Sequence, residues 1–333
     1  MGLPKLLFSV VVFFILNNGF SQTLKGTVLN AKTKAPIESA TIYFDNTTVG
    51  ATTNIKGEFS INYTNAIKSP LIVSFLGFKK QIIADYRTQN NIVIFLEETT
   101  EALNEVVINT DDGLSRKKKL RLFKKEFLGA SRFGKSCKIL NEEDIIIRYN
   151  KNEKTLTAHS KAPLQIENKS LQYLISYDLI YFNLRFKSSN SLQVYSIGFY
   201  GTSYFKNFEN IKNQKALRNR IRAYRGSRLK FMRALYTKNL ELNKFEIYNK
   251  KLKANPWDYF KIEPLKDSDL KEVTLSKKVN VLYDKIIQSA IEFKVPSISI
   301  DFYGNYTHPQ KVIFSGAMAS QRIGELLPFD YGL

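Results

Sequence analysis

The feature that most constrains this 333-residue chain is a series of short apolar segments within residues 22–97. In 58–63, apolar and polar residues alternate with period two, which is typical of a strand that buries one face. Further strands are predicted at 23–29, 40–44, 71–75 and 91–96. Turn-forming residues separate them at 30–36, 45–50 and 54–57. Strands of this length and spacing predict a small antiparallel β-sandwich.

Part of this segment has an ordered set of residues that recurs in a known family. The set comprises Gly26, Val28, Pro36, Ile37, Ala40, Ile42, Gly50, Thr53–Ile61 and Leu71–Phe78. In this order the residues resemble the carboxypeptidase regulatory-like family, whose fold is a transthyretin-like β-sandwich. Gly57 suits the resemblance, because a tight turn before Glu58 needs a residue that tolerates the left-handed conformation. We therefore expect residues 22–98 to form this sandwich.

The family name does not imply a peptidase site in this chain. A zinc carboxypeptidase needs two histidines and a glutamate around its metal, with His-x-x-Glu as the local signature. The chain contains two histidines, His159 and His308, and the residues three positions after them are Ala162 and Lys311. The resemblance therefore implies an accessory domain alone. We predict no zinc site, no other metal and no cofactor.

Residues 1–21 have the three-part layout of a secretory signal peptide. Lys5 supplies positive charge, residues 6–16 are almost wholly apolar, and the small residues Gly19 and Ser21 precede a cut before Gln22. The apolar run is shorter than the roughly 20 residues that a membrane-spanning helix needs. We therefore predict export to the periplasm, the outer membrane or the cell surface, with no transmembrane span after cleavage.

Charge divides the rest of the chain. Residues 22–110 hold eight Lys or Arg and eight Asp or Glu, whereas residues 111–333 carry +19 of the formal net charge of +20. Such an asymmetry marks a domain boundary. We expect a linker at 99–112 and a basic domain of unknown function at 113–333. Its single cysteine, Cys137, cannot form a disulfide within the chain and is expected to be a small buried residue.

The basic domain is predicted to be α+β and dominated by strands. An amphipathic helix is expected at 117–129, with Leu120, Phe123 and Phe127 on its apolar face. Helical spacing returns at 208–240, which predicts an insertion of two helices that meet at Gly226. The predicted strands are 144–149, 155–160, 171–181, 193–204, 245–248, 272–275, 279–283, 297–302 and 311–315. The fold class of the whole chain is therefore mainly β.

A second resemblance concerns the basic domain. Several blocks resemble exported Bacteroidetes proteins that have the same domain order, in which the C-terminal domain has no known activity. The blocks are Phe127–Gly129, Cys137–Asn141, Ala162–Leu164, Tyr224–Ser227 and Gln321–Tyr331. This resemblance implies the class of organism and the two-part architecture.

The densest basic region is 206–253, with 15 Lys or Arg and three Glu. Lys215, Arg218, Arg222 and Arg225 fall on one helical face, beside an apolar edge expected from Leu217, Ile221 and Tyr224. We predict that these four cations bind an anionic glycan, an anionic lipid or an envelope protein. The alternative is a solvated basic surface. Export argues against nucleic acid as the partner, although the charge alone would be compatible with it.

These features support two hypotheses of function. The leading one is a non-catalytic binding or scaffold protein of the cell envelope, with the sandwich as an interaction module. The competing one is an envelope hydrolase of an unrecognised type, with Asp301, His308 and Arg322 in a cleft and Asp330 beside them. Turn and capping chemistry around Gly304 accounts for the same residues without catalysis.

Overall fold

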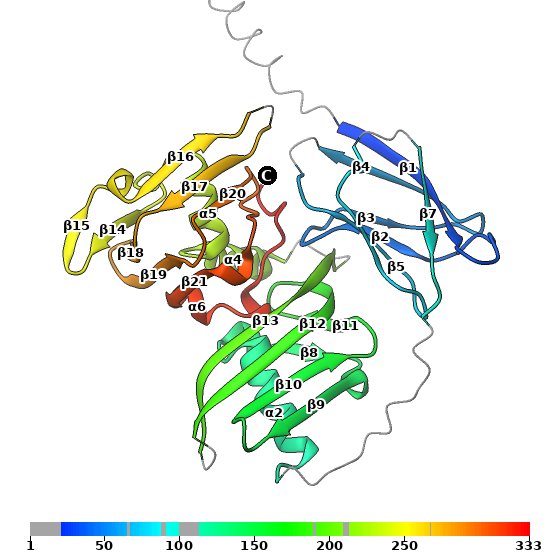
Figure 1. The fold of residues 1–333 in the computed structure, drawn as a ribbon, viewed down its shortest axis with the longest axis horizontal. Helices are drawn as coiled ribbons and strands as arrows, with labels where there is room; N and C mark the ends of the chain where they lie inside the picture. Colours follow the sequence, from blue (N-terminus) through cyan, green and yellow to red (C-terminus); the bar gives the residue numbers. More distant parts are fainter. Residues whose placement is uncertain are drawn as a thin grey trace, which may run out of the picture.

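The computed structural model describes residues 21–64, 67–87, 91–99, 113–188, 191–208, 213–266 and 268–333. These residues form three β-rich units, coloured blue to cyan, green, and yellow to orange in Figure 1, with the red C-terminal segment between them. The chain is mainly β, as predicted. The predicted signal peptide, apart from Ser21, and the predicted linker, apart from Thr99, lie outside the described residues.

The first unit is the β-sandwich of residues 21–99. Its strands are β1 (Ser21–Asn30), β2 (Thr41–Phe44), β3 (Gly50–Thr52), β4 (Glu58–Thr64), β5 (Leu71–Ser74), β6 (Gln81–Ile83) and β7 (Asn91–Leu96). One sheet has the order β4-β1-β7 and the other has the order β3-β2-β5-β6. Residues of β4 alternate strictly between buried and exposed, as period two requires, and Phe59, Ile61 and Tyr63 point into the core.

The five predicted strands of this unit are confirmed, and the structure adds β3 and β6. Each of these two has only three residues, which is too short for a periodic pattern to be recognised. The expectation of a wholly antiparallel sandwich was wrong, because β7 pairs with β1 in parallel, with Gly26 opposite Ile92. Strand β7 enters this sheet after the chain has crossed from the other sheet, so its direction is not set by a hairpin.

The second unit is a six-stranded sheet with helices on one face. Its elements are α2 (Arg116–Leu128), α3 (Arg132–Lys135), β8 (Cys137–Ile139), β9 (Ile145–Asn150), β10 (Thr155–Ser160), β11 (Leu164–Asn168), β12 (Tyr173–Ser188) and β13 (Ser191–Asn207), with a 3₁₀ turn at Glu142–Asp144. The order is β8-β11-β12-β10-β9, and β13 lies along the other side of β12. The helix predicted at 117–129 is confirmed, and it buries Phe123 against Phe182 with ring centroids 4.8 Å apart.

The two helices predicted around Gly226 are also confirmed, as α4 (Gln214–Tyr224) and α5 (Arg228–Tyr236). They belong to different hydrophobic cores. Ala223 of α4 packs into the core of the second unit, whereas Phe231 of α5 lies in the core of the third. Gly226 has φ +63°, and a Cβ there would lie 3.1 Å from the ring of Tyr283, so the turn between the helices requires glycine.

The third unit contains two sheets that enclose α5. Its strands are β14 (Phe245–Asn249), β15 (Leu252–Ala254), β16 (Phe260–Pro264), β17 (Lys271–Leu275), β18 (Val279–Tyr283), β19 (Ile287–Phe293), β20 (Ser297–Ile300) and β21 (Val312–Gly316), followed by α6 (Ala317–Ser320), with 3₁₀ turns at Pro256–Asp258, Pro309–Lys311 and Ile323–Glu325. The sheet orders are β15-β14-β18-β19-β21 and β16-β17-β20. All strands predicted in this part of the chain are found, and β15, β16 and β19 are added.

Candidate anion-binding surface on helix α4

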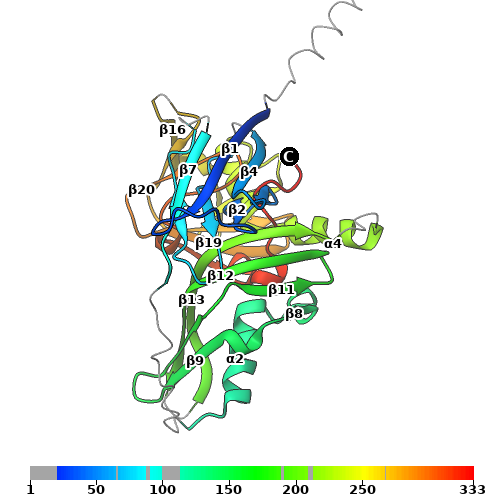
Figure 2. The same cartoon turned by 90° about the vertical axis from the view of Figure 1, so that its right-hand side faces the viewer.

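Helix α4 projects from the side of the molecule, next to β11 and β8 (Figure 2). It starts at Asn213, whose side-chain oxygen accepts a hydrogen bond from the backbone N–H of Lys215 at 3.0 Å. Such a cap satisfies one of the free donors at a helix start. The helix ends at Arg225, just before the turn at Gly226. Its position therefore follows from ordinary start and stop signals.

The face by which α4 packs is small and polar. It consists of Ala216, Asn219, Arg220 and Ala223. The Asn219 side chain donates to the carbonyl of Ser170 at 2.9 Å, in the connection between β11 and β12. The two alanines let the helix approach the sheet closely, and the amide and guanidinium groups then reach carbonyls at the end of that connection.

Arg220 is 6% exposed and holds the helix to the sheet. Its Nε donates to the carbonyl of Leu171 at 2.8 Å, and one terminal nitrogen donates to the carbonyl of Gln172 and to Asn207 Oδ1. The guanidinium also lies 3.8 Å from the ring centre of Tyr173. Burial lowers the pKa of this group, which these acceptors and the ring compensate. This cation is therefore structural and not free for a ligand.

The four predicted site residues lie on the opposite side of α4. Lys215, Arg218, Arg222 and Arg225 are all exposed. None of them takes part in an ion pair with another residue in the described part of the chain. The helix thus presents a stripe of cationic groups to solvent.

The apolar edge expected on α4 lies beside the cationic stripe, as predicted, but it is not the face by which the helix packs on the sheet. Leu217 and Ile221 are 37% and 48% exposed and adjoin the cationic stripe. Tyr224, the third residue of that edge, is half-buried and its ring contacts the ring of Tyr331. The hydrophobic pattern selects the largest apolar side chains, whereas close packing on the sheet here selects Ala216 and Ala223.

The sandwich contacts the second unit through the turn between β2 and β3. The backbone N–H of Asn46 donates to the Ser203 carbonyl at 2.8 Å, and that of Phe205 donates to the Thr47 carbonyl at 3.0 Å. The Asp45 carboxylate accepts from the Ser203 N–H at 2.8 Å. This turn extends the edge of β13 and covers backbone groups that would otherwise be unpaired.

This position disfavours the charged form of the Asp45 carboxyl group. Burial raises its pKa to about 6, although hydrogen bonds from the Ser203 and Asn46 N–H groups and the charge of Lys80 act in the opposite direction. Lys80 itself pairs with Asp178 of β12. The contact between the two units is therefore polar and sensitive to the protonation of one carboxylate. No sequence pattern pointed to it, because its partners are 98 residues apart in one pair and 158 in the other.

The residues of the hydrolase hypothesis have separate partners. Asp301 is buried and accepts from the Asn305 N–H at 2.9 Å within its own turn, and burial raises its pKa to about 6. Arg322 donates to the carbonyls of Glu126 and Gln321. His308 is exposed and has a left-handed backbone with φ +53°. No hydrogen bond or ion pair between described residues joins these three side chains.

The C-terminal segment has a structural role that the sequence did not reveal. The Asp330 carboxylate accepts from the Thr48 N–H at 2.9 Å and from the Thr48 hydroxyl, which ties the segment to the sandwich. Arg233 of α5 is buried and donates to the carbonyls of Phe329, at 2.6 Å, and Tyr331, at 2.8 Å. Through the C-terminal segment, these contacts join the sandwich to the third unit.

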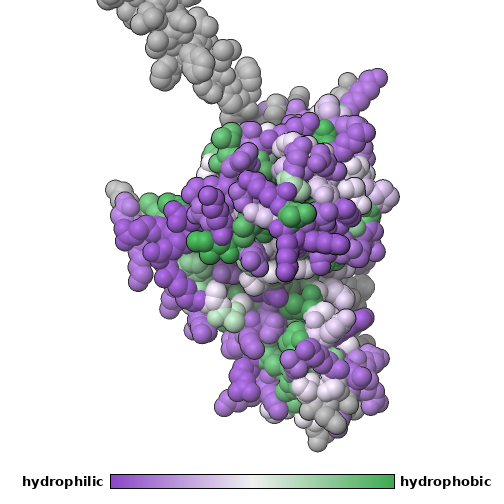
Figure 3. Space-filling model, turned by 90° about the vertical axis from the view of Figure 1, so that its left-hand side faces the viewer, coloured by the Kyte–Doolittle hydropathy of each residue, from purple (hydrophilic) through white to green (hydrophobic). Residues whose placement is uncertain are grey.

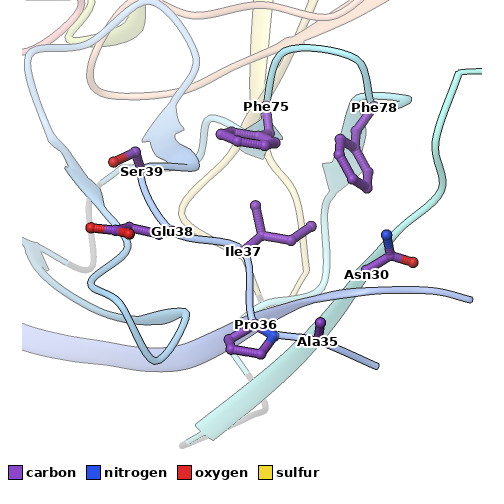
Figure 4. A pocket seen from close by; sticks show the side chains of 8 residues that line it. All are labelled: Asn30, Ala35, Pro36, Ile37, Glu38, Ser39, Phe75 and Phe78. Atoms are coloured by element: carbon purple, nitrogen blue, oxygen red, sulfur yellow. The ribbon is translucent and has the colours of Figure 1, made fainter. Parts of the chain in front are cut away.

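Described residues line several hollows, and one of about 610 Å³ lies on the sandwich beside Lys25, Thr52 and Glu58. Two others differ from it in their lining. One is an open hollow of about 480 Å³ on the sandwich, lined by Asn30, the 35–39 segment, Phe75 and Phe78 (Figure 4). The rings of Phe75 and Phe78 stand at its rim, with centroids 5.5 Å apart. The other is a cavity of about 170 Å³ where the three units meet, lined by residues that include Asn46, Arg228 and Glu325.

Three further features bear on possible chemistry: metal-ligand groups, the Cys137 thiol and the length and apolar character of the helices. Within the described residues, no group of three or more His, Cys, Asp or Glu side chains could hold a metal ion. Burial raises the pKa of the Cys137 thiol to about 12, so the thiolate form is disfavoured. Among the helices that the structure describes, none combines the length and apolar character needed to cross a bilayer.

Comparison with known proteins bears mainly on the sandwich. Residues 24–108 match the family of CarboxypepD_reg-like domains, which confirms the resemblance for this segment. No match is found among curated proteins. A similar solved structure is that of a protein of unknown function from Bacteroides fragilis, 11% identical, with alignment over 89% of this chain and 97% of that chain and a TM-score of 0.20. Similarity at that level carries no argument about fold or function.

Proposed function

We propose that this chain is a non-catalytic binding or scaffold protein of the cell envelope. Its basic C-terminal part contacts an anionic glycan, lipid or protein, and its sandwich serves as an interaction module. The observation that carries the proposal is the stripe of Lys215, Arg218, Arg222 and Arg225, which is exposed and without an ion pair among the described residues. Unpaired exposed cations attract anions over distances of several ångströms.

The contrast within one helix supports this assignment. Arg220 is used to fix α4 to the sheet, and its donors are occupied by carbonyl oxygens. The four site residues have no such structural duty in the described chain. A helix that is held rigidly by one face can present the cations of its other face in a fixed arrangement, which lowers the entropic cost of binding.

Two further features support the proposal. One concerns location in the cell envelope, and the other concerns binding by the sandwich. The first 21 residues have the layout of a signal peptide, which is expected to direct export. The sandwich carries an open hollow with two phenylalanine rings at its rim, on the surface shown in Figure 4. Aromatic side chains beside a hollow are common anchors in protein recognition.

The proposal is tested by binding to soluble polyanions at increasing salt concentration. Polyphosphate and an acidic polysaccharide serve as probes, with the chain that begins at Gln22. Replacement of Lys215, Arg218, Arg222 and Arg225 by glutamine is expected to weaken binding by at least ten-fold and to flatten its salt dependence, because each neutralised cation removes a screened attraction. Replacement of Lys250, Lys251, Lys277 and Lys278 removes the same charge elsewhere and is the control. Equal loss in both variants, or no binding by the unmodified chain, contradicts the proposal.

A further inference from the structure

The cationic stripe of α4 contains two aliphatic side chains that face water. Leu217 and Ile221 lie one turn apart, between the cations and the half-buried Tyr224. They are 37% and 48% exposed, although the helix buries alanines on its other face. Folding of the chain therefore does not account for the choice of leucine and isoleucine here. The exposed side of α4 combines apolar and cationic groups.

A second element with an exposed aliphatic side chain lies beside the C-terminal end of α4. Gly226, directly after α4, packs against Tyr283 and Ile287, so the turn between β18 and β19 lies beside the C-terminal end of α4. Asp284 and Lys285 of this turn both have positive φ, at +50° and +59°. The turn holds Ile286 at 79% exposure, next to the exposed Lys285.

We infer that this surface of α4 docks on a bilayer that contains anionic phospholipids. The inference rests on the proposed function and names the partner. Guanidinium and ammonium groups pair with headgroup phosphates, and the adjacent aliphatic side chains enter the boundary of the acyl region. A soluble glycan or polyanion offers phosphates, sulfates or carboxylates but no apolar layer, so it would use the cations and leave Leu217 and Ile221 in water.

The charge of the molecule favours the same partner. The formal net charge is +20, so the whole chain is attracted to an extended negative surface and is not limited to a single acidic group. On the face shown in Figure 3, hydrophobic side chains lie in small groups among hydrophilic ones. Scattered groups of this kind are ordinary on a folded protein and do not by themselves indicate a partner.

The experiment compares vesicles of phosphatidylcholine and phosphatidylglycerol with vesicles of phosphatidylcholine alone, by co-sedimentation with the chain that begins at Gln22. We expect binding to the anionic vesicles only. Replacement of Leu217 and Ile221 by serine is expected to weaken this binding about ten-fold, and each lost cation about five-fold. The control variant Ile55→Ser with Leu76→Ser removes two exposed aliphatic side chains from the sandwich and is expected to bind as the unmodified chain does.

Polyphosphate binding separates the inference from the proposal on which it rests. The variant with serine at 217 and 221 should bind polyphosphate as tightly as the unmodified chain, and its thermal unfolding should be unchanged. If this variant also retains full binding to anionic vesicles, the lipid inference is overturned and the anion-binding proposal stands. If the unmodified chain binds neither vesicles nor polyphosphate, the proposed function itself is wrong.

Discussion

At the scale of single residues, burial divides the basic side chains into two groups that look alike in the sequence. Arg220 and Arg233 are buried, and each donates to several backbone carbonyls. Removing a guanidinium from water is costly unless its donors find acceptors, so these two must be held in fixed places. Arg218 and Arg222 lie on the same α4 helix as Arg220 but remain in water.

Gly57 permits a direct test of backbone conformation. It has φ +74°, and a Cβ at this position would lie 2.5 Å from the carbonyl oxygen of Val28. Gly57→Ala is expected to destabilise the chain by at least about 3 kcal/mol, because strain and a clash with backbone add up. Gly77 has φ +83° but open space around it, so Gly77→Ala should cost only about 1 kcal/mol. Urea unfolding measures both, and equal costs would contradict the role of the Val28 carbonyl.

Asp45 predicts a pH dependence of the contact between the sandwich and β13. Its folded-state pKa of about 6 lies above the ordinary aspartate value, so the folded protein binds this proton more tightly than the unfolded chain does. The contribution of this group to the free energy of unfolding therefore rises as the pH falls from about 7 toward 4. Asp45→Asn keeps an oxygen for the Ser203 N–H and removes the titration.

The measurement is the free energy of unfolding of both proteins between pH 4 and pH 7. The unmodified chain should gain stability relative to Asp45→Asn as the pH falls, and the asparagine variant should be the more stable of the two near neutrality. Parallel curves over this range would show that Asp45 is not the titrating group.

At the scale of elements, most helices and strands follow from local patterns, but the face by which an element packs does not always do so. The strand β4 and the helix α2 bury the residues that their periodicity predicts. The helix α4 does not, because its partner is the polar connection between β11 and β12, where carbonyl groups need donors. Ala216 and Ala223, seven residues apart, were the available signal of close packing on that face.

The orientation of α4 is tested by a pair of substitutions on its two sides. Ala223 is 4% exposed in the core of the second unit, so Ala223→Leu is expected to destabilise the chain by about 2 kcal/mol through overpacking. Leu217→Ala, on the exposed side, should change stability by less than about 0.5 kcal/mol. Thermal or urea unfolding of the two variants measures these changes in stability. The opposite order of effects would mean that α4 packs by the edge that its hydrophobic pattern indicates.

At the scale of the whole molecule, the three units are joined by contacts between residues far apart in the sequence. Asp330 binds Thr48, and Thr64 shares a hydrogen bond of 2.7 Å with Tyr303. The C-terminal segment thus closes the assembly, since it contacts the sandwich while Arg233 holds it to α5. An interaction module that is docked in this way presents its remaining surfaces in a defined direction.

The docking of the sandwich is tested by Asp330→Ala. Loss of the carboxylate leaves the Thr48 N–H and hydroxyl without their acceptor and is expected to weaken the contact by about 1–3 kcal/mol. Amide hydrogen exchange at Thr48 and Phe205 should become faster, while exchange in the core of the sandwich stays slow. Asp284→Asn removes an exposed ion pair with Lys244 at a position whose backbone asparagine tolerates, and is the control, with an expected cost below about 1 kcal/mol. Unchanged exchange at Thr48 would refute this role.

The sequence by itself determined the mainly β class, the regulatory-like sandwich, the helix α2 and the pair of helices that meet at Gly226. Each depends on local information: period two in β4, period 3.6 in α2, and a turn that only glycine fits. The four cations of α4 could also be placed on one helical face by spacing alone, and their role as a site is still a prediction.

Only the tertiary structure decided which residues of the basic region are free. Leu217 and Ile221 turned out to face water, Arg220 to be buried, and Asp45 and Asp330 to join units that lie far apart in the chain. The physical reason is that burial and pairing depend on what each face meets. A sequence pattern fixes the period of an element, whereas the partner that covers it comes from another part of the chain.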